Sequence, residues 1–200
     1  LYRNHGSASL MTPKVVDLPV QEKSKINSEQ KLKIVRMADS LIEEDDSLIL
    51  TSGSTIEALA LNITPRGRMN VVTPSIRVGV YLSDKENIDV MMLGGRLVVK
   101  SLSVRDSYTQ DGLKYVNCSK MFCSCDGLDV EAGVTTAFIE EARITDAMMD
   151  TAAQVILLVD SSKIGKSGYG KICDLSRIDV LITDAGIPQS VKERIEEEGV

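Results

Sequence analysis

Short apolar runs alternate with helix-like segments along most of this chain, and this alternation constrains the fold more than any other feature. The runs are rich in Val, Ile, Leu and Met and lack a clean two-residue alternation, which is typical of strands covered on both faces. They occupy residues 47–51, 70–73, 88–93, 120–124, 155–159 and 178–182. The pattern predicts a doubly wound α/β fold whose mainly parallel sheet has helices on both faces.

Helical patterns precede, separate and follow these runs. They cover residues 28–43, 55–61, 75–83, 107–115, 137–151 and 190–198. Residues 94–106 do not fit the alternation and are either a loop or a short hairpin, and the direction of an edge strand stays open. We expect residues 1–25 to be a linker, because they are polar and carry two prolines, and residues 26–200 to form one domain.

The net charge and the apolar runs of the chain argue against several classes of protein. A formal net charge of −6 argues against a chain that grips a nucleic-acid backbone by itself. No apolar run approaches the roughly 18 residues of a membrane helix, and the first residues lack the order of a signal peptide. We therefore expect a cytoplasmic protein without a membrane partner.

Cysteine and histidine limit the chemistry. Cys118, Cys123, Cys125 and Cys173 show no Cys-x-x-Cys spacing, which indicates buried free thiols. His5 is the only histidine, so a histidine base in the core and a histidine-rich metal site are both excluded. We expect no metal and no cofactor, and any chemistry would depend on carboxylates, hydroxyls and lysines.

The stretch TSGSTIEALA follows the first apolar run and leads directly into a helix. Its glycine allows close approach to the backbone. The hydroxyls of Ser52, Ser54 and Thr55 can donate, and the helix N-terminus carries about half a positive charge, so the loop can hold a phosphate. Alternatively, Ser54 or Thr55 simply caps the helix, a contact worth about 1 kcal/mol. The loop alone does not decide between these readings.

Other polar groups also follow predicted strands, where ligands bind in open parallel sheets. Asp126 and Asp129 flank a glycine and suit either a pair of pocket carboxylates or an ordinary turn. Lys163 can meet a phosphate as a point charge or lie in a solvated loop. Glu141 at a helix start complements the helix dipole or enters the crevice. Arg96, after two glycines, is either an anion ligand or a surface residue.

Several motifs occur in order along nearly the whole chain: YRNHGSA, LTSGSTIEALA, VVTPSIRV, VMMLGGRL, GLDVEAGVTT, VILLVDSSKIG and DVLITDAGI. Together they resemble the effector-sensing part of the DeoR family of bacterial sugar-metabolism repressors. The resemblance implies a winged helix-turn-helix domain before residue 1, through which alone DNA would be bound. It also implies a fold like those of ribose-5-phosphate isomerase and the coenzyme A transferases, and a homodimer or homotetramer.

The isomerase likeness implies a set of binding residues. Its phosphate loop, its Asp-Gly-x-Asp turn, its catalytic glutamate and its substrate lysine all have counterparts in this chain. The matching positions are Ser52, Gly53, Ser54, Thr55, Asp126, Gly127, Asp129, Glu141 and Lys163, and Arg96 is a weaker addition.

One departure bears on catalysis. After the aspartate turn the isomerase has a lysine and consecutive glycines, whereas this chain has GVTTAF, so a group that stabilises the enediolate charge is missing. We therefore expect a sensor that binds a phosphorylated sugar and is not an enzyme. The alternatives are a sugar-phosphate isomerase with Glu141 as base, or an oligomerisation module without a ligand. Thr51 and Pro74, which stand where many family members have aspartate and asparagine, bear on which sugar is recognised.

Overall fold

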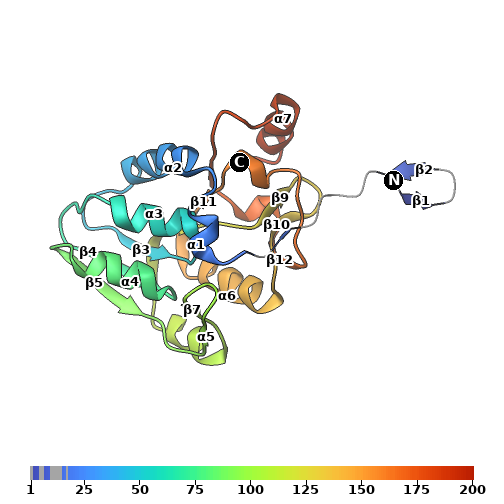
Figure 1. Cartoon of the computed structure of the whole chain (residues 1–200). Coiled ribbons are helices and arrows are strands. Elements are labelled where there is room, and N and C mark those ends of the chain that lie inside the picture. Colours follow the sequence, from blue (N-terminus) through green and yellow to red (C-terminus); the bar gives the residue numbers. More distant parts are fainter. Residues whose placement is uncertain (1, 5–6, 10–14, 17) are drawn as a thin grey trace.

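The computed structural model describes residues 2–4, 7–9, 15–16 and 18–200 (Figure 1). Its centre is a six-stranded sheet in the order β13-β11-β8-β3-β4-β5, with every neighbouring pair parallel. The predicted doubly wound parallel α/β fold is thus confirmed, and no strand of this sheet is antiparallel. The strands are β3 (Ser47–Leu50), β4 (Met69–Thr73), β5 (Ile88–Met92), β8 (Cys118–Cys123), β11 (Ala152–Leu158) and β13 (Val180–Ile182).

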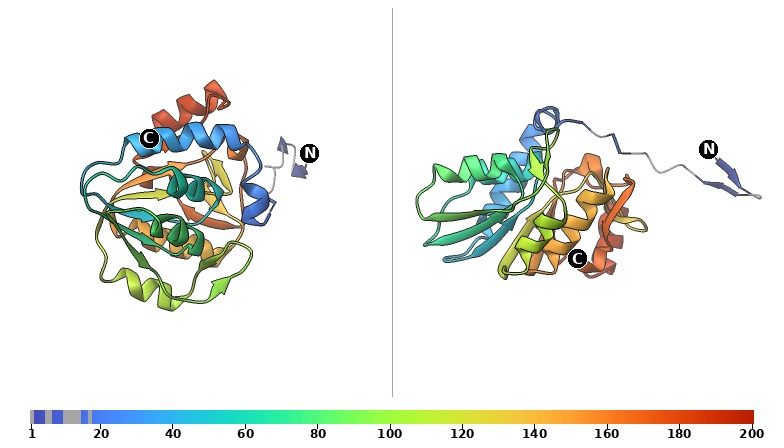
Figure 2. Two further views of the ribbon diagram at one scale, coloured as in Figure 1. Left: turned by 60° about the vertical axis from the view of Figure 1, so that its left-hand side comes forward. Right: turned by 90° about the horizontal axis from the view of Figure 1, so that it is seen from below.

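Helices cover both faces of the sheet (Figures 1 and 2). One core contains side chains of α2 (Ser28–Ser40), α3 (Ser54–Asn62) and α4 (Ile76–Ser83). The core on the opposite face contains side chains of α5 (Ser107–Leu113), α6 (Ile139–Met149) and α7 (Gln189–Glu197).

Each central strand contributes side chains to both cores. Leu48 and Leu50 pack into the core of α2, α3 and α4, whereas Ile49 between them packs into the opposite one. Both sides of the strand are therefore apolar, and this is why the sequence pattern lacked alternation.

The chain order of the strands creates a crevice. From β3 the sheet grows outward through β4 to β5, and the chain then returns to place β8 on the other side of β3. The loops after β3 and β8 therefore leave the sheet in opposite directions, which opens a crevice beyond their carboxyl ends.

Three smaller sheets are antiparallel. β9 (Gly127–Asp129), β10 (Gly133–Thr136) and β12 (Gly170–Cys173) form one sheet beside the crevice. The sequence does not predict this sheet, because its strands carry no continuous apolar run and the first lies in the Asp-Gly-x-Asp turn. β6 (Leu97–Val98) pairs with β7 (Ser103–Val104), so residues 94–106 contain the hairpin alternative. β1 (Tyr2–Asn4) pairs with β2 (Ser7–Ser9).

The end of the predicted linker is folded. Residues Val20–Lys23 form the short helix α1, and the side chain of Val20 is only 4% exposed. The boundary at residue 25 stays a prediction, and part of the linker, including His5, lies outside the described residues.

The cysteines are described by the structure. All four cysteines are free, three of them buried and Cys125 half-buried. Within the described ranges, no helix is long and apolar enough to cross a membrane. The same residues contain no group of three or more His, Cys, Asp or Glu side chains suited to a metal ion.

Candidate functional site

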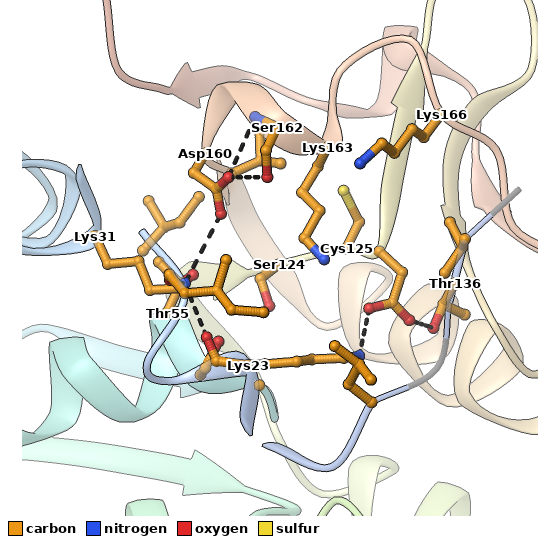
Figure 3. Close-up of a pocket in the computed structure, with 18 of the residues that line it drawn as sticks. Lys23, Lys31, Thr55, Ser124, Cys125, Thr136, Asp160, Ser162, Lys163 and Lys166 are labelled. Atoms are coloured by element: carbon orange, nitrogen blue, oxygen red, sulfur yellow. Dashed lines mark hydrogen bonds and ion pairs between the residues drawn. The ribbon is translucent and has the colours of Figure 1, made fainter. Parts of the chain in front are cut away.

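A cavity of about 220 Å³ lies in the crevice (Figure 3). The loop after β3 contributes residues 52–55 to its lining, and the segment after β8 contributes residues 124–126. The end of β11 and the 3₁₀ turn Ser161–Lys163 form a further side. The cavity therefore occupies the place where the topology predicts a ligand.

The loop after β3 presents the N-terminus of α3 to this cavity. Gly53 is the N-cap residue, and its φ of 121° and ψ of 156° belong to a region that is essentially restricted to glycine. Ser54 and Thr55 are the first residues of the helix, so the reading in which one of them is the N-cap is wrong. Among the described residues no side chain caps α3. Its first amides and the positive end of its dipole are therefore available to an anion.

Asp126 supplies a buried carboxylate to the same cavity. Its Oδ1 lies 2.6 Å from Nζ of Lys23, and its Oδ2 accepts hydrogen bonds from the Thr136 hydroxyl at 3.0 Å and the Ala137 amide at 3.2 Å. Burial raises the pKa of Asp126, but the charges of Lys23 and Lys163 and the hydrogen bonds outweigh it, and the net pKa is lowered. Asp126 is thus a charged acceptor at neutral pH.

Lys163 extends into the cavity from the turn after β11 (Figure 3). Within the described part of the chain, no carboxylate lies within ion-pair distance of its ammonium group. Lys166, from the following loop, lines the same space. A site with two lysines and an open helix N-terminus attracts an anion.

Glu141 is the second predicted carboxylate of the site, and it enters the cavity from the first turn of α6. Nη1 of Arg105 lies 3.3 Å from its Oε2, and the Arg105 guanidinium stacks on the Phe138 ring at 5.0 Å. Burial and the nearby charge of Asp126 raise the pKa of Glu141, against the opposing effect of Arg105. The half-buried Glu141 can accept a hydrogen bond from a ligand hydroxyl.

Three predicted residues lie outside the cavity. The Asp129 carboxylate accepts the backbone N–H groups of Glu131 and Ala132, both at 2.9 Å, which is the turn alternative. Arg96 is exposed on the β6 side of the molecule. Gly127 permits a close approach, since a Cβ there would lie 2.5 Å from the carbonyl oxygen of Lys166.

Several residues of the site were not predicted from the sequence. Lys23, Lys31 and Thr136 line the cavity, as do Asp160 and Ser124. Asp160 could have been found, since it stands in the same VDSSK run as Lys163. Nothing in the sequence indicated Lys23, because it lies in a segment that reads as a linker.

The family of the chain follows from comparison with known proteins. A family model described as the DeoR C terminal sensor domain matches residues 26–185. The chain belongs to the DeoR family. It is 34% identical over 193 residues to the helix-turn-helix regulator YulB of Bacillus subtilis, covering 96% of this chain and 74% of YulB.

A second relative is named as a repressor, and one solved structure has a similar fold. The chain is 30% identical over 197 residues to a lactose phosphotransferase system repressor of Lactococcus lactis, covering 96% of this chain and 77% of the repressor. A probable sor operon regulator of Shigella flexneri has a similar fold, with a TM-score of 0.54 and 11% identity over 84% of this chain and 88% of that one.

This DeoR sensor domain uses the GVTTAF segment structurally. Residues Gly133–Thr136 form the buried strand β10, and the Thr136 hydroxyl donates to Asp126. A threonine of this segment therefore holds the Asp126 carboxylate. A neutral hydroxyl positions Asp126 but supplies no positive charge to an enediolate.

Proposed function

We propose that this chain senses a phosphorylated sugar or sugar derivative for a transcriptional regulator of carbohydrate metabolism. The observation that carries the proposal is the uncapped N-terminus of α3, which shares one cavity with Lys163 and Asp126. An open helix N-terminus and a lysine suit the phosphate group, and an ionised carboxylate suits sugar hydroxyls. One cavity thus offers groups for both ends of a sugar phosphate.

In this proposal the phosphate binds the amides and hydroxyls of residues 52–55 and the ammonium of Lys163. Asp126 and Glu141 accept hydrogen bonds from the sugar hydroxyls. Arg96, Gly127 and Asp129 are left out of the proposed ligand set, because they do not line the cavity.

The regulatory role rests on the relatives. They are named as helix-turn-helix regulators or repressors, and one is named for a lactose phosphotransferase system. We infer that DNA is bound by a separate N-terminal domain, since the net charge of −6 does not suit DNA contact. The protein would act in the cytoplasm as a homodimer or homotetramer. Ligand binding would change DNA affinity through a coupling of about 1–3 kcal/mol.

A sugar-phosphate isomerase is the second candidate, because Asp126 and Glu141 both line the cavity. The missing lysine argues against it. The two are separated by incubating the chain with pentose and hexose phosphates and following isomerisation. Binding without turnover supports the sensor, whereas a rate well above the uncatalysed reaction would establish the enzyme.

The binding site is tested with the double variant Ser54→Ala/Lys163→Ala, and the affinity for a phosphorylated sugar is measured by calorimetry. We expect binding to be lost while the melting temperature of the free protein changes little. The matched control is Ser40→Ala/Lys114→Ala, which removes the same groups from exposed positions. Equal affinity in the double variant and the unmodified chain would refute this site.

A further inference from the structure

A short segment that leads into the predicted domain lines the cavity. Residues 18–26, which we call the N-terminal strap, include α1 and the turn that follows it. Leu18, Lys23 and Ile26 line the main cavity, and Lys23 extends across it towards the side of Thr136 (Figure 3). The strap therefore forms one wall of the site.

The strap also divides the crevice. A second cavity of about 80 Å³ is lined by Leu18, Val20 and Lys23 on its strap side. Both cavities touch Ser52, Gly53 and Glu141. The strap and the loop of residues 52–55 therefore both lie between the two cavities.

Polar contacts hold most of the strap in place. Lys23 pairs with Asp126 at 2.6 Å, and the amide of Val20 donates to the carbonyl of Lys100 at 3.3 Å. Lys31, only 5% exposed, donates to the carbonyls of Lys23 and Ile26. Of the strap's apolar side chains, Val20 is 4% exposed while Ile26 is 47% exposed. A four-residue helix with so little apolar burial belongs to the low-stability part of a fold.

Lys23 has hydrogen-bond donors that its contact with Asp126 does not use. An ammonium group has three donors, and Lys23 uses one of them on Asp126. The Oδ1 atom that it contacts can still accept a hydrogen bond, since a carboxylate has about four lone-pair sites. A polyhydroxy anion in the cavity could therefore accept from Lys23 and donate to Asp126 together.

We propose that Lys23 is a ligand-binding residue and that the N-terminal strap closes on the bound ligand. Ligand binding in the cavity would then also fix the position of the residues that precede the strap. The inference rests on the proposed function, because it needs an anion with hydroxyl groups as ligand. Its direction is specific: the ligand tightens the strap and does not displace it.

The test is hydrogen exchange of peptides covering residues 18–26, with and without a saturating phosphorylated sugar. The probe is whichever of ribose 5-phosphate, glucose 6-phosphate and fructose 6-phosphate raises the melting temperature most. We expect slower exchange in the strap with the sugar bound. Lys23→Met should remove this protection and weaken affinity by about tenfold or more, as for the loss of a charged hydrogen bond.

Two further variants sharpen the result. Lys25→Met makes the same charge change at an exposed position of the strap and should behave like the unmodified chain. Lys23→Arg keeps the charge and should keep the protection. Unchanged affinity in Lys23→Met, or strap exchange that the sugar leaves unchanged or accelerates, would overturn the inference.

A comparison without ligand separates this inference from the proposed function. Without sugar, Lys23→Met should exchange faster in the strap than the unmodified chain. If no sugar phosphate binds the unmodified chain, the proposed function fails and ligand closure fails with it. Faster strap exchange in Lys23→Met would even then show that Lys23 holds the strap in place. Equal exchange would overturn that part as well.

Discussion

Lys23 and Asp126, which are 103 residues apart in the sequence, form an ion pair of 2.6 Å at the cavity. The pair joins a short N-terminal helix to the segment that follows the central strand β8. The site is therefore not contained in the loops of the parallel sheet alone. A ligand that binds Asp126 would therefore lie against Lys23, the last residue of α1.

Gly53→Ala should impair anion binding by the loop of residues 52–55. Its φ of 121° would impose a strain of about 1–3 kcal/mol on alanine, and the added Cβ would lie 2.7 Å from the Ser124 hydroxyl. We expect a lower melting temperature and weaker sugar-phosphate binding, measured by thermal unfolding and calorimetry. Gly199→Ala also has a positive φ but meets no atom within 4 Å, and should leave affinity unchanged. An equal loss of affinity in the control would contradict the role of residues 52–55 in sugar-phosphate binding.

Lys163→Met should weaken binding without weakening the fold. Its ammonium has no ion-pair partner among the described residues, so its removal leaves no carboxylate stranded in contact with it. Loss of a charged hydrogen bond of about 1.5–3 kcal/mol corresponds to a decrease in affinity of about tenfold to a hundredfold.

The matched control for Lys163→Met is Lys171→Met, whose side chain is exposed and pairs with Asp174. Calorimetry with the same sugar phosphate should give unaltered affinity for this control. If Lys163→Met binds as tightly as the control does, Lys163 is not a ligand-binding residue.

Asp46→Asn should lower stability and leave binding intact, because Asp46 lies at the edge of the sheet opposite to the cavity. Its carboxylate is 2.7 Å from Nζ of Lys120 and accepts from the Ser119 hydroxyl at 2.6 Å. We expect the free energy of unfolding to fall by about 1–3 kcal/mol at neutral pH, as measured by denaturant titration. Asp111→Asn, in an exposed pair with Lys114, should cost less than about 1 kcal/mol.

The effect of Asp46→Asn should depend on pH in a defined direction. Burial raises the pKa of Asp46, but Lys120 and Ser119 outweigh it and the pKa in the folded state is lowered. The carboxylate thus stabilises the fold above its unfolded pKa of about 3.9, and this contribution is lost as the pH falls through the folded value. The difference between Asp46→Asn and the unmodified chain should shrink in acid. A difference that grows in acid would refute the stabilising role of the ionised Asp46 carboxylate.

The parallel sheet could be predicted because its strands are apolar runs separated by helical patterns. β8 and β11 start two or three residues earlier than expected, since Cys118 and Ala152 pair with each other at the start of the ladder. The short strands β9, β10 and β12 carry no comparable pattern. Their pairing depends on residues far apart in the chain, such as Val134 and Cys173.

Strand ends predicted part of the site, and the start of α6 predicted Glu141. Ser54, Asp126 and Lys163 follow strands. They were therefore expected together, because ligands of open parallel sheets bind beyond the carboxyl ends of the strands. Arg96 and Asp129 also follow strands, but one lies at the surface and the other closes a turn. Lys23 was not predictable, because its role comes from a contact across the fold and not from a local pattern.

We propose that the cavity recognises a sugar through its phosphate. The most direct measurement is the thermal unfolding of this chain with phosphorylated sugars and with their unphosphorylated parents at equal concentrations. We predict that at least one phosphorylated sugar raises the melting temperature and that its parent does not. A ligand at 100 times its dissociation constant should add about 2.7 kcal/mol of stability. A parent sugar that stabilises the chain as much as its phosphate would contradict the account, and so would the absence of any stabilising phosphorylated sugar.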